Sequence, residues 1–206
     1  MKRHAKYLPL LATISLFAAM AIFGSVSYAG FFSAQAFLNL LIDNAFLVIV
    51  AVGMTFVILT GGIDLSVGSV VALSTMVLAA LVEKYHWALW LAIPLVLLMG
   101  TALGSFMGWL IQRFRLQPFI VTLAGMFLAR GLCYLISIDS ISITDDAYTA
   151  LAQMRIPLWE DAALSLSAVL AVLVLLLAVY LAHATEFGRT VYAIGRSEER
   201  RVGKEC

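Results

Sequence analysis

The sequence predicts an all-α fold, a polytopic bundle of about six membrane-spanning helices with its N-terminus in the cytoplasm. Hydrophobic residues make up 63% of the 206 residues, charged residues make up 12%, and the mean hydropathy is +1.02. Soluble domains are about half apolar and about a quarter charged. Apolar runs of about 20 residues recur along the chain, and each has the length of one membrane crossing. Because lipid cannot pair open backbone groups, continuous runs of this kind predict helices rather than barrel strands.

Six apolar runs fit a membrane crossing, and short breaks separate the first five. A longer and more polar stretch, residues 139–163, precedes the sixth. The second run could instead begin near Asn44. Residues 1–195 form the membrane part, and the charged segment 196–206 is predicted to be a solvated tail. The predicted spans are residues 7–29, 37–59, 65–82, 87–111, 119–138 and 164–183.

The lysines and arginines in the short loops predict a cytoplasmic N-terminus, because such residues favour the cytoplasmic side. With this orientation, only Lys84 and Arg155 fall in the opposite loops. A cleaved signal peptide is the alternative for the first run, although its apolar stretch is long for that role. The basic residues placed inside are Lys2, Arg3, Lys6, Arg113, Arg115 and Arg189.

The sequence gives no indication of a metal, disulfide, nucleic-acid or enzymatic site. Its two cysteines, Cys133 and Cys206, lack a paired spacing. Its histidines are far apart, so no zinc site and no other metal site is predicted. Basic residues are scattered rather than gathered on one face, which argues against nucleic-acid binding. Catalytic and phosphate-binding motifs are absent, so we expect no enzyme activity, no cofactor, and ATP binding only by another chain.

The most unusual passage is residues 60–69, where two glycines interrupt the helical pattern. Asp64 then opens the next apolar run, followed by Ser66 and Gly68. One interpretation is that Asp64 caps the third helix by accepting from its free N–H groups. The other is a polar, flexible hinge that lines a pathway, since irregular backbone at membrane depth must be buried in protein or face water. The two roles are compatible.

Two further polar residues lie inside apolar runs. Arg130, in the fifth run, requires a carbonyl, a carboxylate or water, and either pairs with Asp64 or extends toward an interface. Asn44 either caps the second helix or forms a hydrogen bond across helices. The candidates for the translocation pathway or gate are therefore Asn44, Gly61, Gly62, Asp64, Ser66, Gly68 and Arg130.

Gly100, Gly104 and Gly108 recur at every fourth residue of the fourth run. This spacing places them on one helix face, where small residues let another helix approach closely. We expect them to pack against another helix of the same chain rather than to form a dimer interface.

Three blocks of the sequence carry a family resemblance: residues 43–69, residues 118–126 and residues 185–195. They resemble the permease subunits of bacterial ABC importers for monosaccharides, the ribose, xylose and galactose group. The resemblance extends from about residue 8 to Gly195. Within this group the chain is most similar to the second permease of galactofuranose importers.

The resemblance implies a transport subunit in the bacterial inner membrane. Its expected partners are a second permease subunit, which is either the same chain or a related one, a periplasmic sugar-binding protein and two cytoplasmic ATPase subunits. Residues 185–195 correspond to the start of the cytoplasmic segment that couples to the ATPase. The implied coupling residues are Phe187, Gly188, Arg189 and Gly195.

The resemblance ends at Arg196, where relatives continue with further helices and this chain becomes charged. The sequence therefore indicates a fragment of a longer permease with a tail that is not native to the family. The alternative function is a secondary transporter or channel for a small polar solute. Such a protein requires paired ionisable groups at mid-membrane and usually repeated halves.

Overall fold

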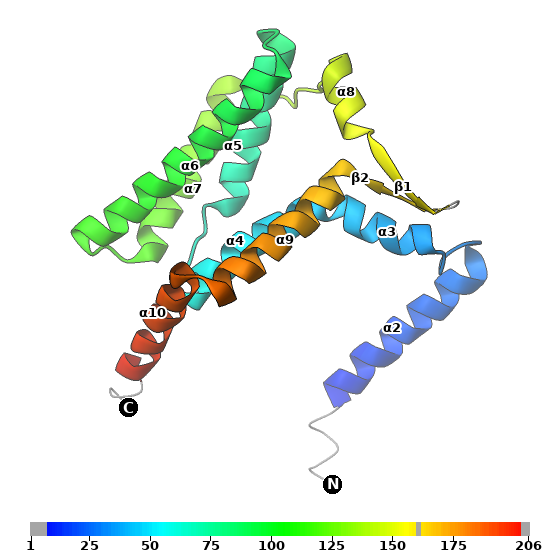
Figure 1. The fold of residues 1–206 in the computed structure, drawn as a ribbon, viewed down its shortest axis with the longest axis horizontal. Helices are drawn as coiled ribbons and strands as arrows, with labels where there is room; N and C mark the ends of the chain where they lie inside the picture. The colour runs from blue at the N-terminus through cyan, green and yellow to red at the C-terminus, as the bar shows by residue number, and fades with distance from the viewer. Residues whose placement is uncertain (1–7, 160–161, 203–206) are drawn as a thin grey trace. The chain divides into compact units, whose positions relative to one another are not determined.

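The computed structural model describes residues 8–159 and 162–202. Most of them are helical, as predicted, and two short strands form a hairpin in the polar stretch before the last span. The elements are α2 (Leu8–Ser27), α3 (Ala34–Asp43), α4 (Ala45–Leu59), α5 (Val67–Ala79), η1 (Ala80–Lys84), α6 (Leu89–Phe114), α7 (Pro118–Ile136), α8 (Asp146–Ala152), β1 (Arg155–Trp159), β2 (Ala162–Ser165), α9 (Leu166–Ala184) and α10 (Glu186–Val202) (Figure 1).

The predicted spans are confirmed to within a few residues. Among the described residues, five helices are long and apolar enough to cross a membrane, or six if α3 and α4 together form one broken span. The break in the second span falls at Asn44, near which the sequence offered an alternative start. The third span begins at Val67 rather than at residue 65, because Ser66 is the N-cap residue of α5.

The chain divides into two compact units, and the smaller one contains α2, α3 and the β1–β2 hairpin. Ser33 caps α3 by accepting a hydrogen bond from Ala36 N at 3.2 Å. Gln35 joins α3 to the hairpin, since its Oε1 accepts from Ala163 N at 2.9 Å and its Nε2 donates to Ala163 O at 3.3 Å. This amide therefore pairs both backbone groups of one hairpin residue.

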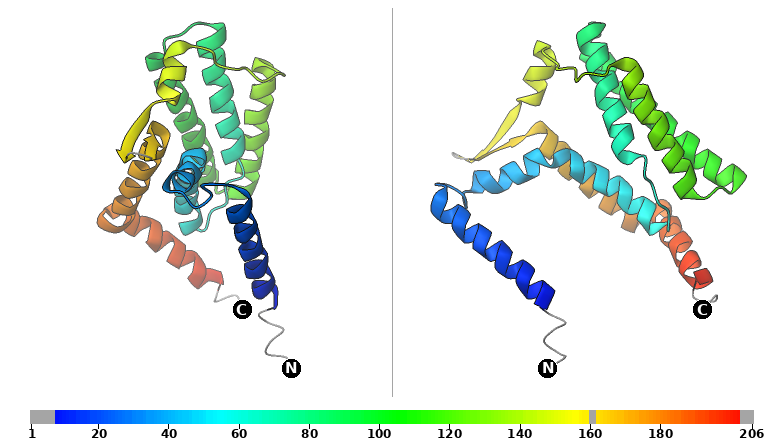
Figure 2. Two further views of the ribbon diagram at one scale, coloured as in Figure 1. Left: turned by 90° about the vertical axis from the view of Figure 1, so that its right-hand side faces the viewer. Right: turned by 180° about the vertical axis from the view of Figure 1, so that it is seen from behind.

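The larger unit contains the remaining helices. α5 packs against α6 and α7, which also contact each other, and α4 packs along α9 (Figures 1 and 2). Leu73 in α5 is only 2% exposed. In α9, Ala168 and Ala171 are fully buried, and small residues of this kind allow helices to approach closely.

Large apolar side chains on the outside of the helices are mostly exposed, as expected for surfaces that face lipid. Leu97 and Leu135, for example, are 66% and 83% exposed. In a membrane these side chains replace the polar surface of a soluble protein, because lipid rather than water surrounds them. The structure thus agrees with the composition from which the fold class was predicted.

The charged segment that begins at Arg196 continues the backbone of α10 as far as Val202. Residues 203–206 lie outside the described residues. The predicted division between residues 1–195 and 196–206 stays a prediction, as do the cytoplasmic N-terminus and the alternative of a cleaved signal peptide.

Candidate functional site

The connection between α4 and α5 begins with a helix stop built on two glycines. Gly61 has a φ of 76°, in the left-handed region that glycine adopts without a steric cost. Its N–H donates to Ile58 O at 2.9 Å, and the N–H of Gly62 donates to Val57 O at 3.0 Å. These two bonds form a Schellman motif, which pairs carbonyls that a helix end otherwise leaves open. The predicted break at residues 61 and 62 is thus a defined helix C-terminus.

Asp64 organises the start of α5, although not in the way predicted. Its Oδ1 accepts from Ser66 N at 2.8 Å and from Ser66 Oγ at 2.6 Å. Ser66 is the N-cap residue and is only 1% exposed, and its own side chain makes no capping bond. The carboxylate therefore fixes the residue from which α5 begins, rather than pairing N–H groups within its first turn.

The side chain of Thr122 in α7 lies near the connection, and Thr122 was not among the residues predicted for the site. Its side chain is buried, and its Oγ1 donates to Pro118 O at 2.8 Å. Ile63 O in the connection lies 3.4 Å from the same Oγ1, which is longer than a usual O–H···O bond. A threonine inside an apolar run normally bonds only to its own helix, so the sequence carried no signal for this contact.

The middle of the connection keeps open backbone groups. Within the described part of the chain, the N–H groups of Ile63, Asp64 and Leu65 donate no backbone–backbone hydrogen bond. In lipid such groups cost several kcal/mol each, so this backbone requires water or protein as a partner wherever it meets the membrane. A role of the connection in the pathway stays a prediction.

Arg130 does not pair with Asp64, so the proposed ion pair is wrong. Arg130 is exposed on α7, and the ion pair found among the described residues joins Arg189 to Glu186. Oδ1 of the Asp64 carboxylate already accepts two hydrogen bonds from Ser66. The remaining hypothesis, that the Arg130 side chain extends toward a membrane interface, stays a prediction.

Asn44 takes neither of its two predicted roles. It is the C-cap residue of α3, and its Nδ2 donates to Leu40 O at 2.8 Å, within the same turn. Its side chain therefore helps to end α3. A role in the pathway stays a prediction for Asn44, as it does for Gly68.

The three glycines of α6 do not pack against another helix in the described chain. A Cβ added at Gly100, Gly104 or Gly108 would meet no heavy atom within 4 Å. The close contact between α6 and α7 is made instead at Gly125, where an added Cβ would collide with the sulfur of Met107. The expectation of packing within the described residues is therefore wrong.

The predicted coupling residues lie on α10, which packs onto α9 and α4. Gly188 forms the corner between α9 and α10, where an added Cβ would collide with the carbonyl of Ala182. The Phe187 ring lies against the Phe56 ring of α4, with a centroid distance of 5.5 Å. α10 is thus attached to the last turn of α9 and to the side of α4.

A second contact joins α10 to the end of α4. An added Cβ at Gly195 would collide with the carbonyl oxygen of Leu59, the last residue of α4. Leu59 precedes the connection directly, so the contact at Gly195 lies next to the helix stop at Gly61. Coupling and gating by these residues stay predictions.

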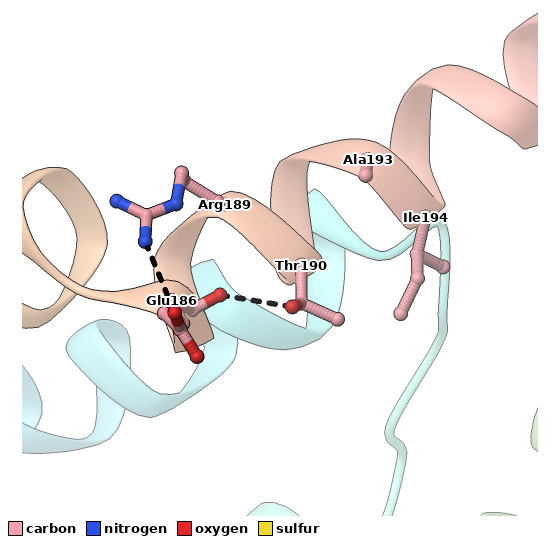
Figure 3. Close-up of a pocket in the computed structure, with 5 residues that line it drawn as sticks. All are labelled: Glu186, Arg189, Thr190, Ala193 and Ile194. Atoms are coloured by element: carbon pink, nitrogen blue, oxygen red, sulfur yellow. Dashed lines mark hydrogen bonds and ion pairs between the residues drawn. The ribbon is translucent and has the colours of Figure 1, made fainter.

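The opposite side of α10 carries an open depression lined by polar and small residues (Figure 3). Arg189 Nη2 lies 3.6 Å from Glu186 Oε1, and both side chains are largely exposed. Thr190 Oγ1 donates to the backbone carbonyl of Glu186 at 2.8 Å. An exposed pair of this kind adds little stability, which leaves these groups available to a partner. The depression is lined by Glu186, Arg189, Thr190, Ala193 and Ile194.

Replacing Gly61 by alanine is expected to destabilise the helix stop, because a left-handed backbone costs a residue with a Cβ about 1–2 kcal/mol. The matched control is Gly68→Ala in α5, where an added Cβ meets no atom within 4 Å. Thermal unfolding of the chain in nanodiscs would show a lower midpoint for Gly61→Ala than for Gly68→Ala. Equal midpoints would contradict the assigned role of Gly61.

The chain matches one known protein family over most of its length. The family described as the branched-chain amino acid transport system / permease component matches residues 36–201, which continues past Arg196. No solved structure matches the chain.

The chain is 46% identical to the inner membrane ABC transporter permease protein YjfF of Escherichia coli (strain K12), over 91% of this chain and 57% of that protein. It is 37% identical to the fructose import permease protein FruG of Bifidobacterium longum (strain NCC 2705), over 95% of this chain and 59% of the relative. It is 38% identical to the ribose import permease protein RbsC of Haemophilus influenzae, over 82% of this chain and 52% of the relative. The chain thus spans between half and three-fifths of the length of these relatives, and it belongs to this family of ABC transporter permeases.

Proposed function

We propose that the chain is part of the permease subunit of an ATP-driven ABC importer that moves a monosaccharide across the bacterial inner membrane. The observation that supports this most directly is the contact of α10 with the end of α4, immediately before the polar connection. The names of the relatives supply the substrate class, since they include permeases for fructose and ribose import. The chemistry of ATP hydrolysis belongs to a separate subunit, and the permease is not an enzyme.

In this proposal α10 is the coupling helix. Its exposed side, with Arg189 and Glu186, docks on a cytoplasmic ATPase subunit (Figure 3). The side that packs on α4 transmits the movement, since Phe187 contacts Phe56 and Gly195 contacts Leu59. Because Leu59 is followed by the glycine stop, α4 can change direction there without pulling α5 along. The connection then acts as a gate that ATP hydrolysis in another subunit opens and closes.

The remaining partners follow from the same proposal. A second permease subunit, identical or related, completes the transmembrane core, and a periplasmic sugar-binding protein delivers the sugar. The glycine face at residues 100, 104 and 108 is open in this chain and can accept a helix from outside the described residues. The N-terminus and α10 then lie on the cytoplasmic side.

The more specific proposal, that the sugar is galactofuranose, rests on the sequence resemblance. The alternative of a secondary transporter or channel requires paired ionisable groups at mid-membrane. Asp64 and Arg130 are the candidates for such a pair, and no ion pair between them occurs among the described residues. The relatives named as ABC transporter permeases support energy supplied by a partner subunit.

Uptake in a strain that lacks its own permease tests the function. The complete permease carrying these residues is expressed with its ATPase and binding protein, and uptake of labelled galactofuranose, galactose, ribose and fructose is measured. We expect uptake to need an active ATPase and to be highest for galactofuranose. Uptake that persists with an inactive ATPase but stops when the ion gradient is dissipated would support the secondary transporter instead. We expect this chain expressed alone to insert without supporting uptake.

Replacing Gly195 by alanine tests the coupling contact in the same assay. Overpacking of this kind typically costs about 1–3 kcal/mol, enough to shift a two-state equilibrium about 5- to 150-fold. We expect uptake to fall while the amount of protein in the membrane stays the same. The matched control is Gly53→Ala in α4, where the added methyl group meets no atom within 4 Å. If Gly195→Ala transports as well as Gly53→Ala, α10 does not act on α4 through this contact.

A further inference from the structure

A carboxylate at the end of the third span holds a separate part of the chain. Glu83 lies in η1, and its Oε2 accepts from Thr144 N at 2.9 Å while its Oε1 accepts from Thr144 Oγ1 at 2.6 Å. The next residue, Lys84, donates from Nζ to Ile136 O at 3.3 Å. Glu83 thus binds the connection between α7 and α8, residues 137–145, which we call the strap, while Lys84 binds the last residue of α7.

The backbone around Glu83 is irregular in two ways. η1 is a π-helical turn, closed by a bond from Tyr85 N to Ala80 O at 3.1 Å. His86, which follows it, has a φ of 53°, in a region that residues with a Cβ rarely occupy. Both features cost energy and tend to persist where a side chain must be held in a particular direction. Here the side chain that makes two hydrogen bonds is Glu83.

The helix at the end of the strap is attached weakly by other means. α8 has no buried residue, so apolar packing contributes little to its position. Asp145 caps it by accepting from Tyr148 N at 2.9 Å, which stabilises the helix but does not attach it to η1. Thr144, which donates both hydrogen bonds to Glu83, directly precedes the capping residue Asp145 in the sequence. The two Glu83–Thr144 hydrogen bonds are therefore the main attachment of the strap to the η1 end of the bundle.

There is room for α8 to move. A cavity of about 550 Å³ lies between α8 and the residues that follow η1, with Trp87, Trp90 and Ile93 on one side and Ala147 and Leu151 of α8 on the other. A shift of α8 toward α6 would bury apolar surface on both sides of the cavity. α8 also contacts α9, so the Glu83 bonds are its attachment at the η1 end and not its sole attachment.

We propose that Glu83 is a positioning residue, a latch that holds the strap and α8 in an open position beside this cavity. Release of the Thr144 bonds lets α8 close over Trp87 and Trp90. The inference does not depend on which sugar is transported or on the coupling role of α10, because it concerns only the η1 end of the bundle.

Hydrogen–deuterium exchange of the chain in nanodiscs tests the latch. Loss of the hydrogen bonds in Glu83→Ala is expected to speed exchange of the Thr144 amide by about 2- to 10-fold. Thr144→Val keeps the N–H and loses the hydroxyl, so it should speed exchange in the strap less than Glu83→Ala does. Thr144→Ser keeps both groups and should exchange at the rate of the parent chain. The control is Glu186→Ala, which removes an exposed carboxylate paired with Arg189 and does not touch the strap. Unchanged strap exchange in both Glu83→Ala and Thr144→Val would overturn the proposal.

Disulfide cross-linking tests the closing movement. Cysteines are placed at Ala147 and Ile93, on opposite sides of the cavity, in a chain whose Cys133 and Cys206 are replaced by serine. We expect cross-linking to be faster when Glu83 is also replaced by alanine. An equal or slower rate would show that the released helix does not close over the cavity.

Discussion

The absence of water in the bilayer core is the constraint on which this structure depends. A helix satisfies its own backbone groups, but a break at membrane depth exposes them, and each must find another partner. Between Leu59 and Val67 the chain meets this requirement with local devices. The glycine stop pairs two terminal carbonyls, and Asp64 pairs the N–H of Ser66. The N–H groups that stay open at the centre of the connection would need water or protein in a membrane, and the pathway role proposed for the connection rests on this need.

The same break also decides how movement can pass through the chain. A continuous helix would join α4 and α5 rigidly. The glycine stop lets each of the two helices move with the helices packed against it. α4 is held by α9 and α10, and α5 is held by α6 and α7. Thr122 is the one described side chain of α7 whose hydroxyl lies near the carbonyl of the connection at Ile63. Under the proposed function, force from an ATPase subunit docked on α10 would reach α4 before α5.

Composition and run length predicted the fold class and the spans, because lipid imposes a length and an apolar surface that a sequence displays directly. The break at Gly61 and Gly62 was also predictable, since adjacent glycines in an apolar run have few other uses. The contacts of Thr122 and Glu83 were not predictable, because each joins residues distant in sequence and depends on side-chain directions. The Asp64–Arg130 pair was wrong for a local reason: Ser66, two residues away, supplies the donors that the carboxylate needs. The spacing of the α6 glycines predicted packing against another helix of this chain, and no described helix covers them, because spacing alone does not show which helix lies opposite.

The central claim is that the connection between α4 and α5 faces water or protein rather than lipid. Nitroxide labels at Ile63, which is 52% exposed, and at Leu176, which is 60% exposed near the middle of α9, allow a direct comparison of collision with oxygen, which concentrates in lipid, and with a water-soluble nickel chelate. The account predicts that the label at position 63 collides relatively more with the chelate than the label at position 176. Equal preference for oxygen at both positions would place the connection in lipid and contradict the account.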